Sequence, residues 1–408
     1  MTTALAGVPV RTILRGLADA AARWADADFP PRVRVLEAVV ERTGYTLPVV
    51  EYGLDRLFGA ITEDALAATV ADELGSLDAL DDFVARSGRP PARALPVGRV
   101  CVVSSRTTIG VALPAAIFAL AAKCDVVVKD REDRLVEAFF GTLAAEHAAF
   151  AAAARAQTWS GAHDARDLSA FEAVVAYGRD ETLARIRERC APEARFFGFG
   201  SRASAGYVAR EALGSEAQTR AVAEGAARDL ALYESEGCLS LHALFVERGG
   251  AVPPERFAEL LAAALERAHV EFPVGERSDS ARARLGSARA LAAFRAAGGS
   301  GAVYSDAEAR HLVVLDPPAS EPPLLLPRAL NLHPVDGTAE ALSYLALHGI
   351  ALEALAASGK RADIVKMALD AGASRIAAFG SLQSPAMEGN HGGRLRVAPY
   401  VRWITSDI

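Results

Sequence analysis

The stretch GRVCVVSSRTTIGVALPAAIFALAAKCDVVVK, residues 98–129, decides the fold class. It begins with a β-branched run that ends at Ser104, continues through an apolar helix from Val111 to Lys123, and closes with a second run that ends at Lys129. Both runs are apolar almost throughout, which is typical of strands in a parallel sheet covered by helices on both faces. The stretch therefore predicts a strand–helix–strand unit of an α/β protein.

The same alternation continues along the chain. Phe171–Tyr177 and Arg195–Gly200 predict two further strands, with a helix over Glu181–Cys190 between them. A helix over Ala217–Leu232 and a strand over Leu241–Val246 then open a second α/β unit. We therefore expect two sheets, which agrees with a length of 408 residues, more than one compact core usually organises.

The composition excludes several classes of protein. Apolar residues make up 51% of the chain and charged residues 23%, as in globular proteins and unlike disordered or collagen-like chains. There is no run of eighteen apolar residues, so we expect no membrane span, and the N-terminus lacks the features of a secretory signal. The net charge of −7 argues against a nucleic-acid partner. We expect a cytoplasmic protein.

Cysteine and histidine are too sparse for a disulfide scaffold or a metal site. The four cysteines, Cys101, Cys124, Cys190 and Cys238, form no C-x-x-C pair, and the eight histidines show no metal-ligand spacing. The sequence therefore predicts free thiols and no metal.

The sharpest local feature is Glu236-Gly-Cys-Leu-Ser240. A cysteine between a glycine and a strand lies where the backbone can approach a ligand, and thiolates are good nucleophiles for thioesters. The alternative is a buried apolar thiol, and the carboxylates of Glu234 and Glu236 would raise the pKa of Cys238. If the strand begins at Cys238, Ser240 and His242 share its face, and even the spacing from i to i+2, about 6.8 Å, is too long for a direct pair between cysteine and histidine.

Other candidates fall at the carboxyl ends of the predicted strands, where parallel sheets bind ligands. Lys129 could contact a ribose or phosphate, or it could simply extend to solvent from its strand end. The turn over Gly200–Gly206 could offer backbone N–H groups to a pyrophosphate at a helix start. No G-x-G-x-x-G motif follows the first strand, so the common dinucleotide fingerprint is absent.

Taken together, the pieces resemble the aldehyde dehydrogenase superfamily, and more closely the acyl-CoA reductase family that includes the fatty-acyl reductase subunit of bacterial luciferase systems. The stretches that carry the resemblance are VVVK at 126–129, VVAYG at 174–178, RFFGFGS at 195–201, DLALYESEGCLS at 229–240, HGG at 391–393 and VRW at 401–403. The similarity runs from about residue 30 to the end of the chain.

The resemblance implies a Rossmann-type nucleotide-binding domain followed by an α/β catalytic domain. The expected boundaries are an N-terminal helical region over residues 1–97, the nucleotide-binding domain over 98–232, the catalytic domain over 233–380 and a tail over 381–408. Because members of the superfamily are usually oligomeric, a homo-oligomer is expected, and a partner enzyme in an aldehyde-producing pathway is possible.

The resemblance also implies roles for single residues. Cys238 would take the acyl group from a thioester of coenzyme A or an acyl-carrier protein, and NADPH would then supply hydride. The residues expected to contact this cofactor are Lys129, Gly200, Ser201, Ser204 and Ser104.

Two departures from the superfamily are visible. The interval between Gly200 and Cys238 holds no Glu-Leu-Gly-Gly segment, which supplies the base for water in aldehyde dehydrogenases, so thioester reduction is favoured. Thr107 stands where the family usually has an asparagine that stabilises the oxyanion, and losing such a donor costs on the order of 100- to 1000-fold in rate. The hydroxyl of Thr107 or Thr108, or the N–H of Cys238, would have to compensate.

The sequence therefore predicts an NADPH-dependent acyl-thioester reductase that forms an aldehyde through an acyl-cysteine. One alternative is an aldehyde dehydrogenase that forms an acid or acyl-CoA. The other is a nucleotide-binding subunit without turnover that stabilises a partner enzyme, and Thr107 is its best support.

Overall fold

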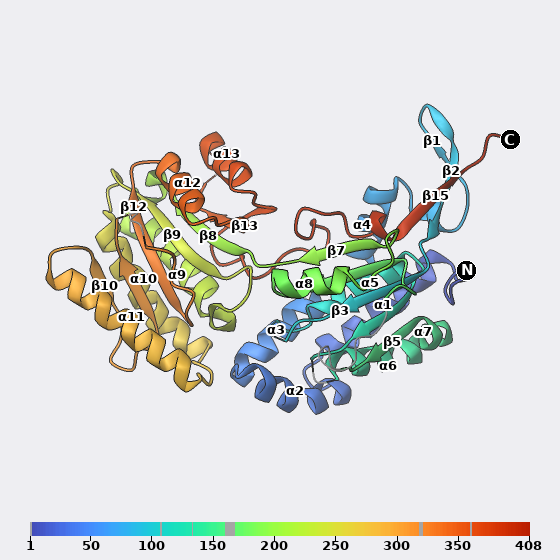
Figure 1. Cartoon of the computed structure of the whole chain (residues 1–408), viewed down its shortest axis with the longest axis horizontal. Coiled ribbons are helices and arrows are strands. Elements are labelled where there is room, and N and C mark those ends of the chain that lie inside the picture. Colours follow the sequence, from blue (N-terminus) through green and yellow to red (C-terminus); the bar gives the residue numbers. More distant parts are fainter. Residues whose placement is uncertain (1, 107, 133, 160–167, 318–320, 360) are drawn as a thin grey trace. The chain divides into compact units, whose positions relative to one another are not determined.

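The structure is a computed structural model that describes residues 2–106, 108–132, 134–159, 168–317, 321–359 and 361–408. It contains two compact units (Figure 1). Unit 1 comprises Met1–Thr43, Val50–Ser201 and Ala386–Ile408, and unit 2 comprises Gly44–Val49 and Arg202–Pro385. The chain thus passes from unit 1 to unit 2 between residues 201 and 202, whereas the predicted domain boundary lies between 232 and 233.

A five-stranded parallel sheet forms the centre of unit 1, in the order β5-β4-β3-β6-β7. Its strands are β3 (Arg99–Val103), β4 (Asp125–Lys129), β5 (Ala154–Gln157), β6 (Ala173–Tyr177) and β7 (Arg195–Phe199). Chain order runs outward from β3 on one side through β4 and β5, and on the other side through β6 and β7. The order therefore reverses between β3 and β6, and ligands bind at such a switch point in open α/β sheets.

Helices surround this sheet and carry a buried aromatic cluster. The helices of the unit are α1 (Val10–Ala25), α2 (Pro30–Thr43), α4 (Glu63–Leu74), α5 (Ala112–Ala121), α6 (Leu135–Glu146), α7 (Ala148–Ala153) and α8 (Asp180–Arg187), while α3 (Leu47–Gly59) begins in the unit 2 segment. Trp24, Phe58 and Phe139 pack together with ring centroids 5.1 to 6.1 Å apart. Thr62 caps α4, because its side chain accepts the Ala65 N–H at 3.1 Å.

A second, antiparallel sheet in unit 1 was not predicted. It consists of β1 (Val84–Arg86), β2 (Arg89–Pro96) and β15 (Val401–Thr405), in that order. The prediction that residues 1–97 contain only helices and connections is therefore wrong, and residues 386–408 are an integral part of unit 1. The pairing of β2 with β15 joins segments about three hundred residues apart, which no local pattern reveals.

Unit 2 is built on a seven-stranded sheet in the order β10-β11-β12-β9-β8-β13-β14, parallel except for β10. Its strands are β8 (Ala203–Val208), β9 (Leu241–Glu247), β10 (Ala302–Tyr304), β11 (Leu312–Leu315), β12 (Ala329–Val335), β13 (Leu352–Ala357) and β14 (Arg375–Ala377). Successive side chains of β9 point to opposite faces of the sheet and so contribute to two hydrophobic cores. Leu244 and Val246 join the core with α9 and α10, whereas Ala243 and Phe245 join the core with α12 and α13.

The helices of unit 2 follow this division between the two faces (Figure 1). They are α9 (Glu216–Ala231), α10 (Pro254–Glu271), α11 (Asp279–Ala297), α12 (Thr338–Leu347) and α13 (Ala362–Asp370). Helix α11, which the sequence analysis did not identify, covers Leu312 and Val314 of β11. In the described part of the chain, every helix is too short or too polar to cross a membrane.

Candidate active site

Cys238 lies in a loop of unit 2 just before β9, and its side chain is exposed. The predicted strand start at Leu241 is confirmed, and the alternative start at Cys238 is excluded, because β9 begins at Leu241. A tight turn occupies the interval: the Ser240 N–H donates to the Gly237 carbonyl at 2.9 Å, and the Gly237 N–H donates to Ser240 Oγ at 3.1 Å. The spacing argument against a pair with His242 therefore does not apply, since the two residues do not share one strand.

The Cys238 thiol holds its proton at neutral pH. Desolvation by the surrounding protein and, next, the negative charge of Glu353 raise its pKa to about 11, although the residue is exposed. The backbone N–H groups of Cys238 and Leu239 oppose this rise because they favour the thiolate. The predicted effect of a nearby carboxylate is thus present, but its main source is Glu353 on β13 rather than the sequence neighbours of Cys238.

Ser204 positions the loop that carries Cys238. Its hydroxyl donates to the Cys238 carbonyl at 2.7 Å and accepts the Ala354 N–H of β13 at 3.1 Å. The residue is 1% exposed, so one buried hydroxyl fastens β8, β13 and the Cys238 loop together. The hydroxyl is thus engaged within the protein, and the predicted contact between Ser204 and a cofactor stays a prediction.

Lys129 and Ser104 end adjacent strands at the predicted ligand edge of unit 1, and both are buried. Lys129 Nζ lies 5.0 Å from the centre of the Trp159 ring, so the lysine does not simply extend to solvent. The Ser104 hydroxyl donates to Glu132 Oε1 at 2.8 Å, and the Ser105 carbonyl oxygen lies 2.9 Å from the same hydroxyl. Ser104 therefore holds the edge of the site together, and a role of its hydroxyl in binding stays a prediction.

Glu132 is a residue of this edge that the sequence analysis missed. Its carboxylate accepts the Gly110 N–H at 2.5 Å as well as the Ser104 hydroxyl, so it spans the loop between β3 and α5. Burial raises its pKa to about 7. Thr107, the candidate for oxyanion stabilisation, belongs to this loop and lies outside the described residues. An acidic residue three positions after a strand-ending lysine was the signal available in the sequence.

Gly200 and Ser201 do not precede a helix. They link β7 to β8, so the predicted helix start after Gly200 is wrong. The strand-to-helix turn lies instead at Gly178, between β6 and α8. The Ser201 N–H donates to Asp180 Oδ1 at 3.1 Å, and a Cβ on Gly200 would lie 2.1 Å from the same oxygen. A side chain at 200 would have to displace the exposed Asp180 carboxylate, and binding of a pyrophosphate at this turn stays a prediction.

Two arginines add positive charge to the ligand edge of unit 1. Arg131 follows β4, and Arg106 lies in the loop after β3. Burial, and next the positive charge of Arg106, lower the pKa of Arg131. Such a mutual repulsion is relieved by an anion, so this edge suits a phosphate-bearing ligand.

An aromatic cavity lies inside unit 1, beyond the ends of β6 and β7. The Tyr177 and Phe199 rings stack with centroids 5.1 Å apart, and His391 meets Phe199 edge-on at 4.3 Å. Burial, and next Arg396, lower the pKa of His391 to about 4, so this ring is neutral at physiological pH. The residues lining the cavity are Pro114, Ala115, Phe118, Tyr177, Phe197, Phe199, His391, Arg394, Leu395, Arg396, Pro399 and Tyr400. Its walls suit an apolar or planar group.

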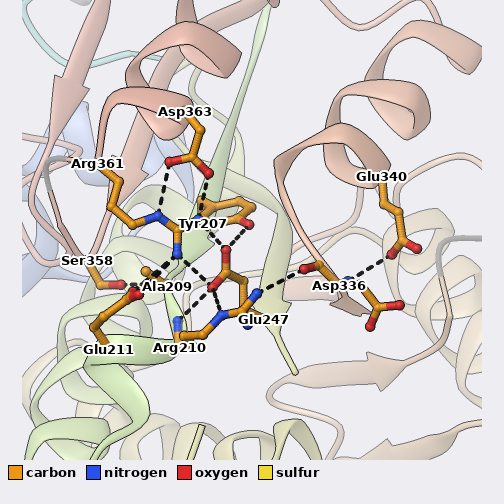
Figure 2. Close-up of polar contacts among 10 residues, drawn as sticks. All are labelled: Tyr207, Ala209, Arg210, Glu211, Glu247, Asp336, Glu340, Ser358, Arg361 and Asp363. Carbon is orange, nitrogen blue, oxygen red and sulfur yellow. Dashed lines mark hydrogen bonds and ion pairs between the residues drawn. The ribbon is translucent and has the colours of Figure 1, made fainter. Parts of the chain in front are cut away.

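The opposite end of β9 carries a polar cluster, drawn in Figure 2. Glu247, the last residue of β9, has a fully buried carboxylate that accepts the Tyr207 hydroxyl at 2.5 Å and the Arg361 guanidinium at 2.5 and 2.9 Å. It also accepts the side chain and the backbone N–H of Arg210 at 2.9 and 3.0 Å. The donors of this cluster are thus already paired with carboxylates, which marks it as structural.

One group of side chains in unit 2 has the composition of a metal site, namely His269, Asp306 and His311. Its hydrogen bonds argue against that role. Arg328 donates to His269 Nδ1 at 2.8 Å, which leaves the proton of the neutral ring on Nε2, where it faces His311 Nδ1 at 3.2 Å. Because Asp306 is also paired with Arg310, the group forms a hydrogen-bonded chain rather than an open set of ligands.

Comparison with protein families gives one match that covers nearly the whole chain. The family model described as Acyl-CoA reductase (LuxC) matches residues 5–403. No curated protein matches the chain.

Solved structures with the same fold are aldehyde dehydrogenases. An aldehyde dehydrogenase from Brucella melitensis biovar abortus 2308 is 14% identical with a TM-score of 0.70, covering 97% of this chain and 84% of its own. An NAD-dependent benzaldehyde dehydrogenase from Corynebacterium glutamicum is 15% identical with a TM-score of 0.67, covering 99% and 86%. A glyceraldehyde-3-phosphate dehydrogenase from Methanocaldococcus jannaschii, complexed with NADP, is 11% identical with a TM-score of 0.68, covering 98% and 90%. The predicted aldehyde-dehydrogenase-like α/β fold is confirmed.

Proposed function

The chain belongs to the acyl-CoA reductase (LuxC) family, and we propose that it reduces an acyl thioester to the aldehyde with NADPH through an acyl group held on Cys238. The observation that carries the proposal is the exposed thiol of Cys238 in a loop fastened on both sides, by Ser204 and by the turn that ends at Ser240. A reactive thiol needs exposure and a fixed position, and the other three cysteines are buried or half-buried.

In the first step the Cys238 sulfur attacks the thioester carbonyl. The new carbon–sulfur bond forms as the bond to the coenzyme A or carrier-protein sulfur breaks, and that sulfur leaves with the proton given up by Cys238. The N–H groups of Cys238 and Leu239 partly offset the rise in the thiol pKa that burial and Glu353 cause. Exchange between two thioesters is close to balanced in energy, so the step needs orientation more than driving force.

In the second step two electrons and a proton convert the acyl group to an aldehyde. The cofactor supplies these electrons as hydride when bound. The hemithioacetal on Cys238 then collapses, the carbon–sulfur bond breaks to release the aldehyde, and the sulfur takes a second proton from solvent to regenerate the thiol. The absence of a Glu-Leu-Gly-Gly base between Gly200 and Cys238 supports this outcome over hydrolysis to an acid.

The ligand edge of unit 1 fits a phosphate-bearing dinucleotide. Lys129 ends β4 beside the switch point, and Arg131 and Arg106 place two further cations at the same edge. Three cations suit the additional 2′-phosphate of NADPH better than the free ribose of NADH.

The test is the variant Cys238→Ser in the full-length protein. We expect NADPH consumption with acyl-CoA to fall to background, because a serine hydroxyl is a far weaker nucleophile, while NADPH binding stays within about twofold. Rates are followed by NADPH absorbance and binding by nucleotide fluorescence. Full activity of this variant would remove the proposal, and failure of wild-type Cys238 to take up a radiolabelled acyl group would favour a partner subunit without turnover.

A further inference from the structure

Three consecutive residues just before Cys238 adopt left-handed backbone conformations. Tyr233, Glu234 and Ser235 have φ values of 54°, 51° and 58°. Residues with a Cβ avoid this region, and they occupy it singly rather than in series. The conformation has to be imposed by the surrounding structure, and such strain is concentrated at functional sites.

The side chain of Glu234 supplies a strong anchor for this turn. Its carboxylate is almost fully buried and pairs with Arg328 Nη2 at 2.6 Å and with Arg277 Nη2 at 3.1 Å. It also accepts the Gly275 N–H at 3.3 Å. One buried carboxylate therefore meets two guanidinium groups from separate segments, and such charge-assisted bonds are stronger than neutral ones.

Both arginines are in turn fixed to the backbone. Arg328 is fully buried and donates to the carbonyls of Phe272 and Pro273 at 2.9 and 3.1 Å, and its own φ of 48° is left-handed. Arg277 donates to the carbonyls of Ala309 and Arg310 at 2.9 and 2.7 Å. The two cations are thus fixed points, so the position of the Glu234 carboxylate is set by the framework of unit 2.

The turn leads directly to the thiol. The Glu236 N–H donates to the Tyr233 carbonyl at 2.9 Å, and the Ser235 hydroxyl donates to the Leu230 carbonyl of α9 at 2.9 Å. Only Glu236 and Gly237 separate this turn from Cys238. A relaxation of the turn to right-handed conformations would therefore redirect the chain at the entry to the Cys238 loop.

We infer that Glu234 is a positioning residue for Cys238: its buried ion pairs with Arg328 and Arg277 hold the left-handed turn Tyr233–Ser235 and thereby orient the thiol for attack. This inference rests on the proposed function, because it assigns the turn a purpose only if Cys238 is the nucleophile. A displacement of about 1 Å in a reacting group can reduce a rate about 100-fold.

The test compares two reactions of the same sulfur in Glu234→Gln. Transfer of a radiolabelled acyl group from acyl-CoA needs the thiol aligned with bound substrate, whereas alkylation by iodoacetamide, followed on the Cys238 peptide by mass spectrometry, does not. We expect the first-order acylation constant to fall about 100-fold and the alkylation constant to change less than about threefold. Glu266→Gln, which breaks the exposed pair between Glu266 and Arg310, is the matched control and should change neither.

A rescue separates orientation from general damage. Glycine accepts left-handed conformations without steric cost. The double variant Glu234→Gln, Ser235→Gly should therefore be acylated about tenfold faster than Glu234→Gln alone. If Glu234→Gln does not fold, Arg277→Gln removes one of the two cations and should lower acylation about tenfold with alkylation unchanged.

The outcomes distinguish this inference from the proposed function. Equal acylation constants in wild type and Glu234→Gln would overturn the inference and leave the nucleophile in place. A parallel loss of acylation and alkylation, without rescue by glycine, would also overturn it, because the ion pairs would then only support the fold. A wild-type protein that takes up no acyl group would overturn the proposed function itself.

Discussion

Glu247 shows how much a single buried carboxylate contributes in this chain. Its side chain is fully buried at the end of β9 and accepts five hydrogen bonds, from Tyr207, Arg210 and Arg361 (Figure 2). These donors outweigh desolvation and lower its pKa to about 2. As the pH falls, the unfolded chain takes up this proton near its ordinary value, before the folded protein does.

The first prediction concerns acid stability. The contribution of Glu247 is complete above about pH 4.5 and is lost as the pH falls toward 2, a difference of roughly 3 kcal/mol. Glu247→Gln should therefore be less stable by about this amount at pH 7, and the gap should close at acid pH. Urea unfolding of the wild type and the variant at pH 7, 4 and 2.5 measures the stability difference and its change with pH. Glu211→Gln, which removes only an exposed partner of Arg361, should cost less than about 0.5 kcal/mol; a constant gap across pH would contradict the assignment.

At this scale the sequence singled out Cys238 but not the structure that supports it. Cys238 could be singled out because a glycine precedes it and a strand follows it. The left-handed turn before it could not, because Tyr233 and Ser235 carry no signal for such a conformation and the arginine that holds Glu234 comes from a distant loop. Ser204 shows another limit of the sequence. Its place beside a strand could be predicted, but the burial of its hydroxyl could not.

Helix α9 packs closely against the segment after β14 at Gly225. A Cβ at this position would lie 2.7 Å from the Phe379 carbonyl carbon and 2.8 Å from its oxygen, both backbone atoms that cannot move alone. Asp229, one turn later, accepts the N–H groups of Gly380 and Leu382 at 2.7 and 3.0 Å. Helix α9 thus holds the segment after β14 through these two hydrogen bonds. In the same segment, the Gln383 side chain donates to Ser240 Oγ at 2.9 Å, beside the Cys238 loop.

Gly225→Ala is therefore expected to destabilise unit 2 by about 1–3 kcal/mol, because the backbone of the facing segment must shift. The matched control is Gly286→Ala on α11, where nothing lies within 4 Å of the new methyl group and a gain of about 0.5–1 kcal/mol is expected. Thermal unfolding of the two variants should shift in opposite directions. A neutral Gly225→Ala would mean that the contact between α9 and Phe379 is looser than described.

The elements themselves were predicted best where a local pattern was strong. The β3–α5–β4 stretch, β6, β7 and β9 follow from apolar runs bounded by polar residues. The connection after β7 was predicted wrongly, because Gly200 and the serines after it suit a helix start as well as the loop before β8. The segment after Gly200 forms strand β8 because it pairs with β9 and β13, and the local sequence does not reveal these pairings.

At the scale of the whole molecule, unit 1 depends on residues 386–408. Within these residues β15 pairs with β2, and the Val401 carbonyl accepts the Arg195 guanidinium at 2.8 Å. The Tyr400 carbonyl accepts the Val97 N–H at 2.9 Å and the Cys124 thiol at 3.4 Å. The prediction of a C-terminal tail missed β15, just as the prediction for residues 1–97 missed β2. Each of these two strands is recognisable only together with the other.

Deletion of residues 386–408 should therefore damage unit 1 selectively. We expect amide hydrogens of β2 that face β15 to lose protection by at least about tenfold, because β2 keeps only β1 as a partner, while those of β9 in unit 2 keep their protection. Hydrogen exchange followed by mass spectrometry reports both strands in one experiment. Unchanged protection of β2, or an equal loss in β9, would contradict the division into two units.

The discontinuity of unit 1 has a consequence for biosynthesis. All of Arg202–Pro385 is translated between the two parts of unit 1 that must associate. At about 5–20 residues per second the interval lasts roughly 10 to 40 s. During it β2 presents an unfilled edge on the ribosome-bound nascent chain, so we expect transient chaperone occupancy near residues 89–96, ending when β15 emerges from the exit tunnel.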